Sequence, residues 1–282
     1  MLREAVLAPV FDHAVIDARD ELERAARVYG RLGFNLSERG HHTLGSSNHL
    51  AVFGTNYLEL LGWEKGAPAR PDLDGFPIGL GGFVFRVGDA EAACMRLREA
   101  GLLAESPIAF SRPVRQPSGK EEDAKFRAVR FPRETLAGSR TYLCEHLTPQ
   151  LVWREGNAAH ANGALDVTRL VMAAAKPSRV AGLMRTMFGA DAVVANESAY
   201  TLGAGSTVIE IVEPAALGQL FQGAEPDLRG RDEVLAAITL RTRSLRMTAD
   251  ALRDGDVDAR VSTKRILVPA AEALNVTLEF VE

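Results

Sequence analysis

One pattern occurs four times along the chain, and this repetition limits the possible folds more than any other feature of the sequence. Each copy starts with an apolar segment that runs into an amphipathic stretch and stops at a glycine. The copies read FDHAVIDARDELERAARVYGRLGF (11–34), GGFVFRVGDAEAACMRLREAGL (81–102), LDVTRLVMAAAKPSRVAGLMRTMFG (165–189) and AAITLRTRSLRMTADALRDGDV (236–257). A unit that recurs in this way is typical of one small module that buries its apolar face against its neighbours.

The amphipathic part of each copy predicts a helix that packs on a sheet. In the first copy, Leu22, Ala25 and Tyr29 follow one another at spacings of three and four residues, which places them on one helical face. Asp20 and Asp89 stand where an N-cap oxygen would accept hydrogen bonds from the first helical N–H groups. A left-handed C-cap favours glycine, and the glycines expected to end the helices are Gly33, Gly101, Gly189 and Gly255.

Each copy closes with a short apolar run. These runs read NYLELLG (56–62), TYLCEHL (141–147), TVIEIVE (207–213) and VTLEFVE (276–282). Because each copy has room for about three strands after its helix, we interpret the module as βαβββ and the fold class as α+β. Aligning the closing runs places Glu59, Cys144, Glu210 and Glu279 at one position. Aligning the opening segments places together His13, Gly82, Val167 and either Thr239 or Leu240.

The segment REGNAAHANGA (154–164) is rich in Asn, Gly and Ala and is typical of a domain boundary. We therefore expect two domains of two modules each. The N-terminal domain spans 8–153, with modules at 8–65 and 79–153, and the C-terminal domain spans 164–282, with modules at 164–215 and 234–282. His160 and Asn162 are expected to organise the turn between the domains.

Paired modules with an FDH opening and a YLEL closing resemble the vicinal oxygen chelate superfamily of glyoxalases, bleomycin resistance proteins and extradiol dioxygenases. Three segments resemble a glyoxalase-like branch of it more narrowly: RGHHTLGSSNHLAVFGTNYLELLG (39–62), FSRPVRQPSG (110–119) and CEHLTPQLVWREGNAAHANGA (144–164). The resemblance covers essentially the whole chain. It implies two glyoxalase-like domains, each a curled mixed sheet around one cavity, with metal ligands from the first and last strands of each module.

By this resemblance, His13 and Glu59 match two of the four metal-ligand positions. Imidazole nitrogen and carboxylate oxygen hold Fe, Zn, Ni or Mn and leave positions open for substrate oxygens. The second module has Gly82 and Cys144 where the superfamily has His and Glu, but His146 follows on the same strand face and could complete a set with His13 and Glu59. The sequence does not decide between one bound divalent metal and none. Without a metal, His13 would form a hydrogen bond with Glu59.

Other side chains are expected to line the N-terminal cavity. Arg112 precedes Pro113, which keeps the backbone extended, so the guanidinium could bind a carboxylate or phosphate of a ligand; a surface salt bridge is the alternative. The remaining expected substrate-binding residues are His42, His49, Phe53, Phe126 and Trp153. Loop positions for the histidines and core packing for the aromatic residues are the competing interpretations.

All six histidines lie in the first 160 residues, so the C-terminal modules keep only the carboxylates of Glu210 and Glu279. Two carboxylates in one dry cavity would repel each other, so one should be protonated or salt-bridged, with Arg169 or Arg241 as partner. We expect this half to be structural or ligand-binding.

The expected function is that of an enzyme acting on a small organic molecule with vicinal oxygens, by lyase, isomerase or dioxygenase chemistry. His13 and Glu59 are its expected catalytic residues. Without a metal, Glu59 could act as a general base on a carbon acid while His13 polarises the oxygen. The alternative is a non-catalytic small-molecule binding or resistance protein, for which the low aromatic content of 6% counts against large planar ligands.

Charge and apolar patterning exclude several other classes. The net charge is -4 and the arginines are scattered, so no nucleic acid is expected to bind. The sequence contains no apolar run long enough for a membrane span, and its N-terminal segment contains none long enough for a signal peptide. Cys94 and Cys144 are the only cysteines, which favours the reducing cytoplasm. The oligomeric state could be a monomer or a homodimer.

Overall fold

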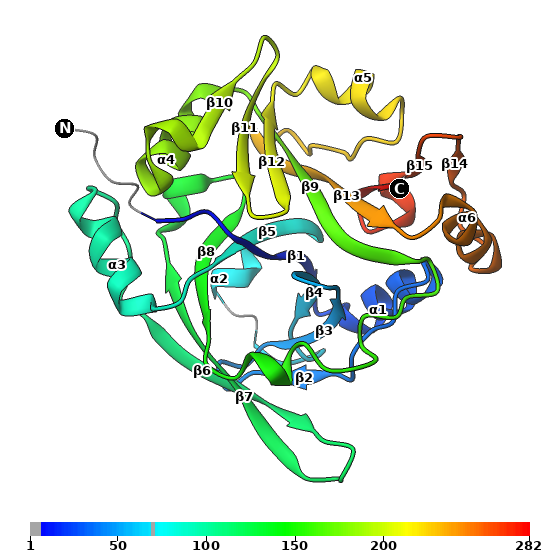
Figure 1. Ribbon diagram of the computed structural model, residues 1–282, viewed down its shortest axis with the longest axis horizontal. Coiled ribbons are helices and arrows are strands. Elements are labelled where there is room, and N and C mark those ends of the chain that lie inside the picture. Colours follow the sequence, from blue (N-terminus) through cyan, green and yellow to red (C-terminus); the bar gives the residue numbers. More distant parts are fainter. Residues whose placement is uncertain (1–6, 69–70) are drawn as a thin grey trace.

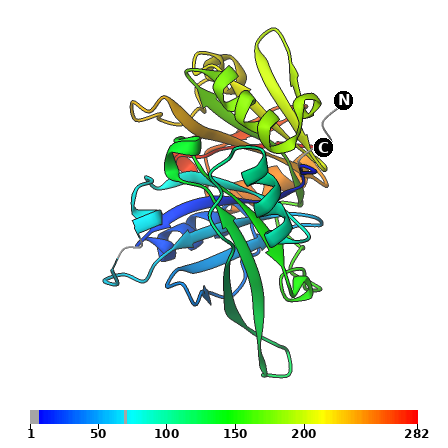
Figure 2. The same ribbon diagram turned by 90° about the vertical axis from the view of Figure 1, so that its left-hand side faces the viewer.

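Two eight-stranded mixed sheets form the protein, one from each half of the chain (Figures 1 and 2). The structure, a computed structural model, describes residues 7–68 and 71–282. Residues 1–6, part of the segment searched for a signal peptide, lie outside the described residues. Within the described residues, every helix is too short or too polar to span a membrane.

The first sheet has the strand order β2-β3-β4-β1-β5-β8-β7-β6. Its strands are β1 (Phe11–Arg19), β2 (Gly40–His41), β3 (Ser47–Val52), β4 (Tyr57–Gly62), β5 (Gly79–Arg86), β6 (Ile108–Arg115), β7 (Glu121–Arg130) and β8 (Arg140–His146). In each module the first strand lies parallel to the last, and β1 joins β5 in antiparallel fashion.

The second sheet repeats this topology in the order β10-β11-β12-β9-β13-β16-β15-β14. Its strands are β9 (Ala164–Ala174), β10 (Val193–Ala195), β11 (Ala199–Ala204), β12 (Thr207–Val212), β13 (Glu233–Thr242), β14 (Arg260–Val261), β15 (Ile266–Val268) and β16 (Thr277–Val281). The predicted fold of four βαβββ modules in two curled mixed sheets is therefore confirmed.

Each module has one helix after its opening strand. These helices are α1 (Leu22–Arg31), α3 (Ala90–Glu99), α4 (Pro177–Phe188) and α6 (Leu245–Asp254). Shorter helices, α2 (Pro71–Asp74) and α5 (Ala216–Phe221), connect the modules within each half. Single 3₁₀ turns occur at Arg133–Leu136, Pro149–Leu151, Ala190–Ala192 and Ala270–Glu272.

The two sheets and the four longer helices share one hydrophobic core. A continuous cluster joins Ile16 and Phe85 of the first sheet to Met172 and Ile238 of the second. The rings of Phe85 and Phe188 lie 4.6 Å apart between centroids, which packs β5 against α4. Full burial of one such side chain stabilises the fold by about 1.5–3 kcal/mol. The domain boundaries stay a prediction, because both halves contribute to this core.

The helix ends follow the predicted caps only in part. Asp89 accepts a hydrogen bond from the N–H of Ala92 at 3.0 Å, as expected, whereas α1 begins after Glu21 without a side-chain cap, so the N-cap prediction for Asp20 was wrong. Gly33, Gly101 and Gly189 have positive φ, but Gly255 does not. A Cβ at position 255 would lie 1.9 Å from the carbonyl oxygen of Arg31, so glycine there permits the ends of α6 and α1 to touch.

The strand pairing corrects the alignment of the opening strands. Tyr57 and Tyr142 are equivalent residues of the closing strands; Tyr57 pairs with His13, and Tyr142 pairs with Val84. The counterpart of His13 in the second module is therefore Val84 and not Gly82. Register shifts in the pairing of β1 with β5 displace the backbone in a way that sequence alignment does not reveal.

The same correction applies to the second sheet. Val208 occupies the place of Tyr57 and pairs with Arg169. Arg169, and not the expected Val167, is thus the counterpart of His13 in the third module. In the fourth module Thr239, one of the two expected residues, lies opposite Arg169 as Val84 lies opposite His13.

The segment between the halves is fixed to the first module by two side chains. His160 Nε2 lies 2.9 Å from the carbonyl oxygen of Val52, and its Nδ1 accepts a hydrogen bond from the N–H of Asn35. Asn162 donates to the carbonyl oxygen of Leu32 at 2.8 Å. The expectation that His160 and Asn162 organise this turn is confirmed.

The concave side of the second sheet is filled. Leu217 and Phe221 of α5 pack into a buried cluster against that sheet. Arg169 donates to Glu210 at 2.9 Å and to Glu279 at 3.0 Å, which confirms the expected salt bridge. Arg241, the other candidate, pairs with Asp166 instead.

Replacing Arg169 by methionine should lower the free energy of unfolding by about 1–3 kcal/mol, because Glu210 and Glu279 lose their shared hydrogen-bond donor. Urea denaturation monitored by circular dichroism measures this change. In the control Arg241→Met, a more exposed ion pair is lost and the expected cost is below about 1 kcal/mol. Equal costs for the two variants would contradict the assignment.

Candidate functional site

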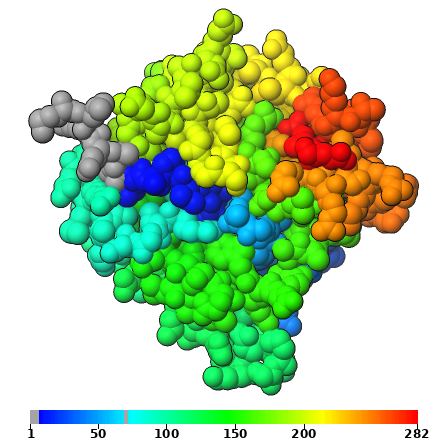
Figure 3. Space-filling model, viewed as in Figure 1, coloured from blue at the N-terminus to red at the C-terminus, as the bar shows by residue number. Residues whose placement is uncertain are grey.

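The first sheet curls until its two edges meet, and this closure encloses a cavity. The N–H of Thr43, just after β2, donates to the carbonyl oxygen of Ser111 on β6 at 2.9 Å, and the N–H of Ser111 donates to Thr43 Oγ1 at 3.1 Å. The hairpin of β6 and β7 extends from the body of the molecule next to this seam (Figures 1 and 3). The cavity volume is about 290 Å³, which suits a small organic molecule.

His13 and Glu59 both line this cavity, because alternate residues of β1 and β4 face its interior. His13 Nε2 and Glu59 Oε2 lie 3.6 Å apart, and Glu59 is only 5% exposed. Asn48 donates to Glu59 Oε1 at 2.7 Å. Burial alone would raise the pKa of Glu59, but His13, His42 and the hydrogen bond from Asn48 lower it below its usual value, so the carboxylate is ionised at neutral pH.

Asp12 orients His13 from behind. It is completely buried, and its Oδ2 lies 2.7 Å from His13 Nδ1 and 2.8 Å from His146 Nε2, while its Oδ1 accepts a hydrogen bond from Arg86 at 2.6 Å. Burial alone would raise the pKa of Asp12, but the hydrogen bonds from the two histidines hold it far below its usual range. An ionised carboxylate only accepts, so the Nδ1 of His13 carries a proton and its Nε2 faces Glu59.

Two tyrosines hold the imidazole of His13 on its remaining sides. The ring of Tyr57 stacks on it at a centroid distance of 4.3 Å. The hydroxyl of Tyr142 lies 3.1 Å from His13 Nε2. Burial raises the pKa of both tyrosines well above their usual value, so both stay neutral.

The structure places three of the six expected substrate-binding residues on the cavity wall: His42, Arg112 and Phe126. His42 Nδ1 lies 2.8 Å from Ser46 Oγ, and its Nε2 lies 4.0 Å from Glu59 Oε1. Phe126 stacks on Phe110 at a centroid distance of 5.2 Å, so β6 and β7 supply an aromatic wall.

The other three expected residues lie outside the cavity. His49 is on the opposite face of β3 from Asn48, and its Nδ1 lies 2.8 Å from the carbonyl oxygen of Ser37. Phe53 follows that strand and belongs to the core between the sheets. Trp153 packs behind the cavity against His146, with Arg86 over its ring at 4.3 Å.

The four ligand positions of the superfamily do not fit a metal in this chain. His13 and Glu59 are present, but their counterparts in the second module are Val84, which has no ligand atom, and Cys144, a thiol whose pKa is raised well above its usual value by burial. His146 does not complete the expected set with His13 and Glu59, since its Nε2 is bound to Asp12 on the far edge of the His13 ring.

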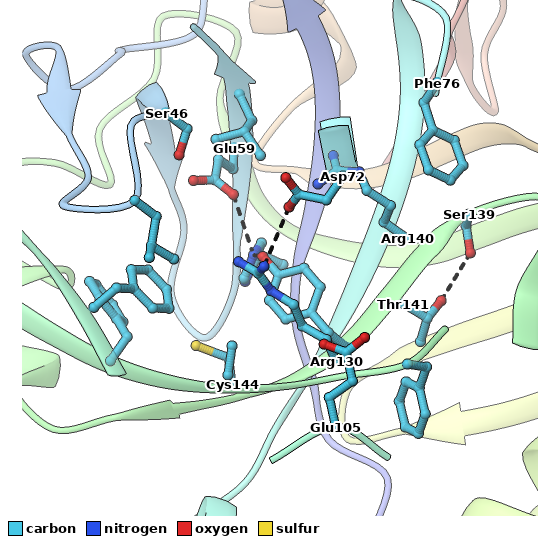
Figure 4. A pocket seen from close by; sticks show the side chains of 18 of the residues that line it. Ser46, Glu59, Asp72, Phe76, Glu105, Arg130, Ser139, Arg140, Thr141 and Cys144 are labelled. Atoms are coloured by element: carbon cyan, nitrogen blue, oxygen red, sulfur yellow. Dashed lines mark hydrogen bonds and ion pairs between the residues drawn. The ribbon is translucent and has the colours of Figure 1, made fainter. Parts of the chain in front are cut away.

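A different group of potential ligands lies beside this site. Asp12, Cys144 and His146 bring one ligand atom each to within 4.8 Å of one another, and among the described residues no other such group of three His, Cys, Asp or Glu occurs. The Nδ1 of His146 is buried and has no hydrogen-bond partner among the described residues. Figure 4 shows Cys144 and Glu59 in the same pocket, with Asp72 reaching Arg130 at its rim.

Asp17 adds a pH-dependent element next to the cavity. It is buried, and burial raises its pKa to about 6 although it pairs with Arg140. A carboxyl group whose pKa is higher in the folded state binds more protons there than in the unfolded chain, so it costs stability as the pH rises from about 4 to about 6. We expect Asp17→Asn to gain up to about 3 kcal/mol relative to the natural protein between pH 4 and pH 7.

Guanidinium denaturation of both proteins at pH 4 and pH 7 measures the change in this difference. Asp74→Asn serves as the control, because its carboxylate is half exposed and pairs with Arg19 at the surface. A difference that does not vary with pH would contradict the prediction.

A cavity in a curled sheet of two βαβββ modules, with histidine on the opening strand and glutamate on the closing strand, defines a protein of the vicinal oxygen chelate superfamily. The chain belongs to the glyoxalase-like domain family, whose sequence model matches residues 11–188. The match extends from β1 to the end of α4 and covers the strands around the cavity. No curated protein matches the chain.

Solved structures share the fold over nearly the whole chain. A hypothetical protein from Staphylococcus aureus has a TM-score of 0.65 at 13% identity, covering 96% of this chain and 98% of that chain. A mutant of 4-hydroxymandelate synthase from Streptomyces coelicolor has a TM-score of 0.57 at 14% identity, covering 97% and 92%. A fusion of a xylose isomerase-like TIM barrel with a 4-hydroxyphenylpyruvate dioxygenase has a TM-score of 0.60 at 16% identity, covering 98% of this chain and 50% of the fusion.

Proposed function

We propose that the protein is an enzyme that binds a small organic molecule with vicinal oxygens in the cavity of the first sheet and moves a proton on it. The observation that carries this proposal is the approach of Glu59 Oε2 to His13 Nε2 at 3.6 Å inside one small cavity. An ionised base and an oriented imidazole at this distance can contact a carbon and the oxygen next to it. Glyoxalase-like relatives and neighbours named as a synthase and a dioxygenase support an enzymatic role.

The two residues have distinct roles in this proposal. Glu59 takes the proton from a carbon next to a carbonyl group, and the electron pair of the broken C–H bond moves onto the carbonyl oxygen. His13 lies between the carboxylates of Asp12 and Glu59, so a protonated ring donates from both nitrogens, and its Nε2–H stabilises the enediolate oxygen. Returning the proton to the former carbonyl carbon, while the adjacent hydroxyl group loses its proton, gives an isomerase. Expelling a leaving group from the carbon on the other side of the deprotonated carbon, as the carbonyl group forms again, gives a lyase.

The test is solvent exchange. The protein is incubated in D₂O with 2-hydroxyaldehydes, 2-hydroxyketones and 2-oxo acids, and proton NMR follows deuterium entering the carbon next to the carbonyl group. We expect protein-dependent exchange for at least one compound and none with His13→Ala. Exchange at the uncatalysed rate for the whole panel would contradict the proposal.

A metal-dependent form of this activity is the second candidate, and the group of Asp12, Cys144 and His146 favours it. Cysteine sulfur, imidazole and carboxylate are donors that zinc prefers, and a divalent ion held by these residues would polarise substrate oxygens. Mass spectrometry of protein purified without a histidine tag measures Fe, Zn, Ni and Mn. Stoichiometric metal that is lost in Cys144→Ser would favour this candidate, and its absence would favour proton transfer without metal.

The alternative to an enzyme is a small-molecule binding or resistance protein, which the loss of half the superfamily ligand positions favours. Its sign would be thermal stabilisation by ligands without conversion, unchanged in His13→Ala.

In either case we propose a cytoplasmic protein, supported by two free buried cysteines, and a monomer or homodimer that acts on a small molecule and not on nucleic acid.

A further inference from the structure

Arg112 is a buried cation on the wall of the cavity. It is 5% exposed, and among the described residues its guanidinium makes no hydrogen bond or ion pair. The other arginines of the cavity wall are satisfied: Arg130 by Asp72, Arg140 by Asp17 and Arg133 by the carbonyl oxygen of Gly75. Burial lowers the pKa of Arg112 although the nearby charge of Glu59 raises it, so an anionic ligand would stabilise the charged guanidinium.

Gly40 creates the space that Arg112 occupies. A Cβ at position 40 would lie 2.9 Å from Arg112 Cδ and 3.1 Å from its Nη1, and 2.6 Å from Asn48 Oδ1. The guanidinium and this amide oxygen therefore approach the same point above Gly40. Since Gly40 has no positive φ, its lack of a side chain serves this close approach and not a turn.

Asn48 Oδ1 is the second unsatisfied group at this place. It is buried and has no hydrogen-bond partner among the described residues, while the Nδ2 of Asn48 is used by Glu59. This oxygen is closed off from the cavity, whereas no guanidinium nitrogen of Arg112 is among the fully buried, unpartnered atoms of the described residues, so Arg112 is the group that a ligand can reach. Its complement is a pair of anionic oxygens.

We infer that the ligand of this cavity is a small carboxylate with an apolar group, and that its carboxylate binds Arg112. This assignment deepens the proposed function and rests on its use of the same cavity. The fork of a guanidinium matches a carboxylate in a bidentate manner. The stacked rings of Phe110 and Phe126 favour an aromatic or other apolar group on the rest of the ligand.

Calorimetric titration of the full chain with matched probes tests this inference. The probes are 3-phenyllactate, its neutral amide, 3-phenylpropionate, which lacks the hydroxyl group, and inorganic phosphate. Hydrogen bonds to charged groups contribute about 1.5–3 kcal/mol, so the amide should bind about 10- to 100-fold more weakly than 3-phenyllactate. Phenylpropionate keeps the carboxylate and should bind about as tightly as 3-phenyllactate. Phosphate should compete only weakly, because it lacks the apolar group that packs on Phe110 and Phe126.

Two substitutions identify the residue responsible. Arg112→Met keeps the unbranched side chain as far as the position of Nε but removes the charge. It should weaken 3-phenyllactate binding by the same 10- to 100-fold and remove the preference over the amide. It should also raise the melting temperature of the ligand-free protein, since an unpaired buried charge is removed; a residue with a purely structural role would lower it. Gly40→Ala keeps the charge but displaces the guanidinium, and should weaken binding too. Arg115→Met, on the exposed face of the same strand, is the control and should bind normally.

Several outcomes overturn the inference: no binding of any probe, equal binding of acid and amide, or unchanged binding in Arg112→Met. Its failure is distinguishable from that of the proposed function. Exchange of a neutral substrate that is indifferent to Arg112 would remove the carboxylate ligand and keep the enzyme. Binding that depends on Arg112 without any exchange would keep the ligand class and remove the enzyme.

Discussion

Substitution of Glu59 by glutamine is expected to slow deuterium exchange into the substrate by about 10²- to 10⁴-fold, the range over which a general base contributes. Glutamine has the same shape, and its amide oxygen can still accept the hydrogen bond from Asn48. It has no basic oxygen for the proton, so the chemical step loses its acceptor. Initial exchange rates by proton NMR at saturating substrate measure the effect.

The pH dependence of the same reaction follows from the lowered pKa of Glu59. A base must be ionised to act, so the rate should fall only at a pH below the usual glutamate value of about 4.3 and should show no acidic decline between pH 5 and pH 7. Glu64→Gln is the matched control, because Glu64 lies outside the cavity, half exposed, and pairs with Arg39. If Glu59→Gln exchanges as fast as Glu64→Gln, another group is the base.

The modules could be predicted from the sequence because their signals are local. Helical spacing in α1, the strand alternation of YLELLG and the glycines after the helices each depend on a few neighbouring residues. Repetition of these weak signals four times made the topology predictable. The same reasoning placed Glu59 and His13 on one cavity, since both lie on regular strands whose alternation is short-range.

The partners of these residues could not be predicted, because they come from distant parts of the chain. Asp12 and His146 are 134 residues apart, and their contact depends on how β8 lies beside β5. The FDH opening contains Asp12, but nothing in it says that the carboxylate is buried. Register shifts in β1 and β5 also hid the equivalence of His13 and Val84.

The second source of error in the predicted site was the face of the strand to which a side chain was assigned. His49 was expected on the cavity wall, but its neighbour Asn48 is the residue that faces inward, and a shift of one residue exchanges the faces. Phe53 lies on the core side for the same reason. Arg112 lies where it was expected, but its close approach to Gly40, from the other edge of the sheet, could not be predicted.

Removal of the Asp12 carboxylate should have the largest effect on stability. Asp12→Ala leaves Arg86, His13 and His146 without the oxygen atoms to which they donate, in a site where Asp12 is wholly buried. Breaking a buried charge network by removing one partner costs about 3–5 kcal/mol, because the remaining polar groups stay desolvated. Guanidinium denaturation at pH 7 measures the loss, and Asp74→Ala, which removes an exposed carboxylate, should cost less than about 1 kcal/mol.

The pH dependence separates this electrostatic cause from a loss of packing. The pKa of Asp12 is lowered in the folded state, so its contribution is complete above the unfolded value of about 3.9 and is lost as the pH falls below it. The gap between the natural protein and Asp12→Ala should therefore be full from pH 5 to pH 7 and shrink below pH 4. Asp12→Asn, which keeps the volume but loses the charge, should show the same trend. A gap that persists unchanged at pH 3 would mean that Asp12 acts through packing, and the orientation of His13 would then need another explanation.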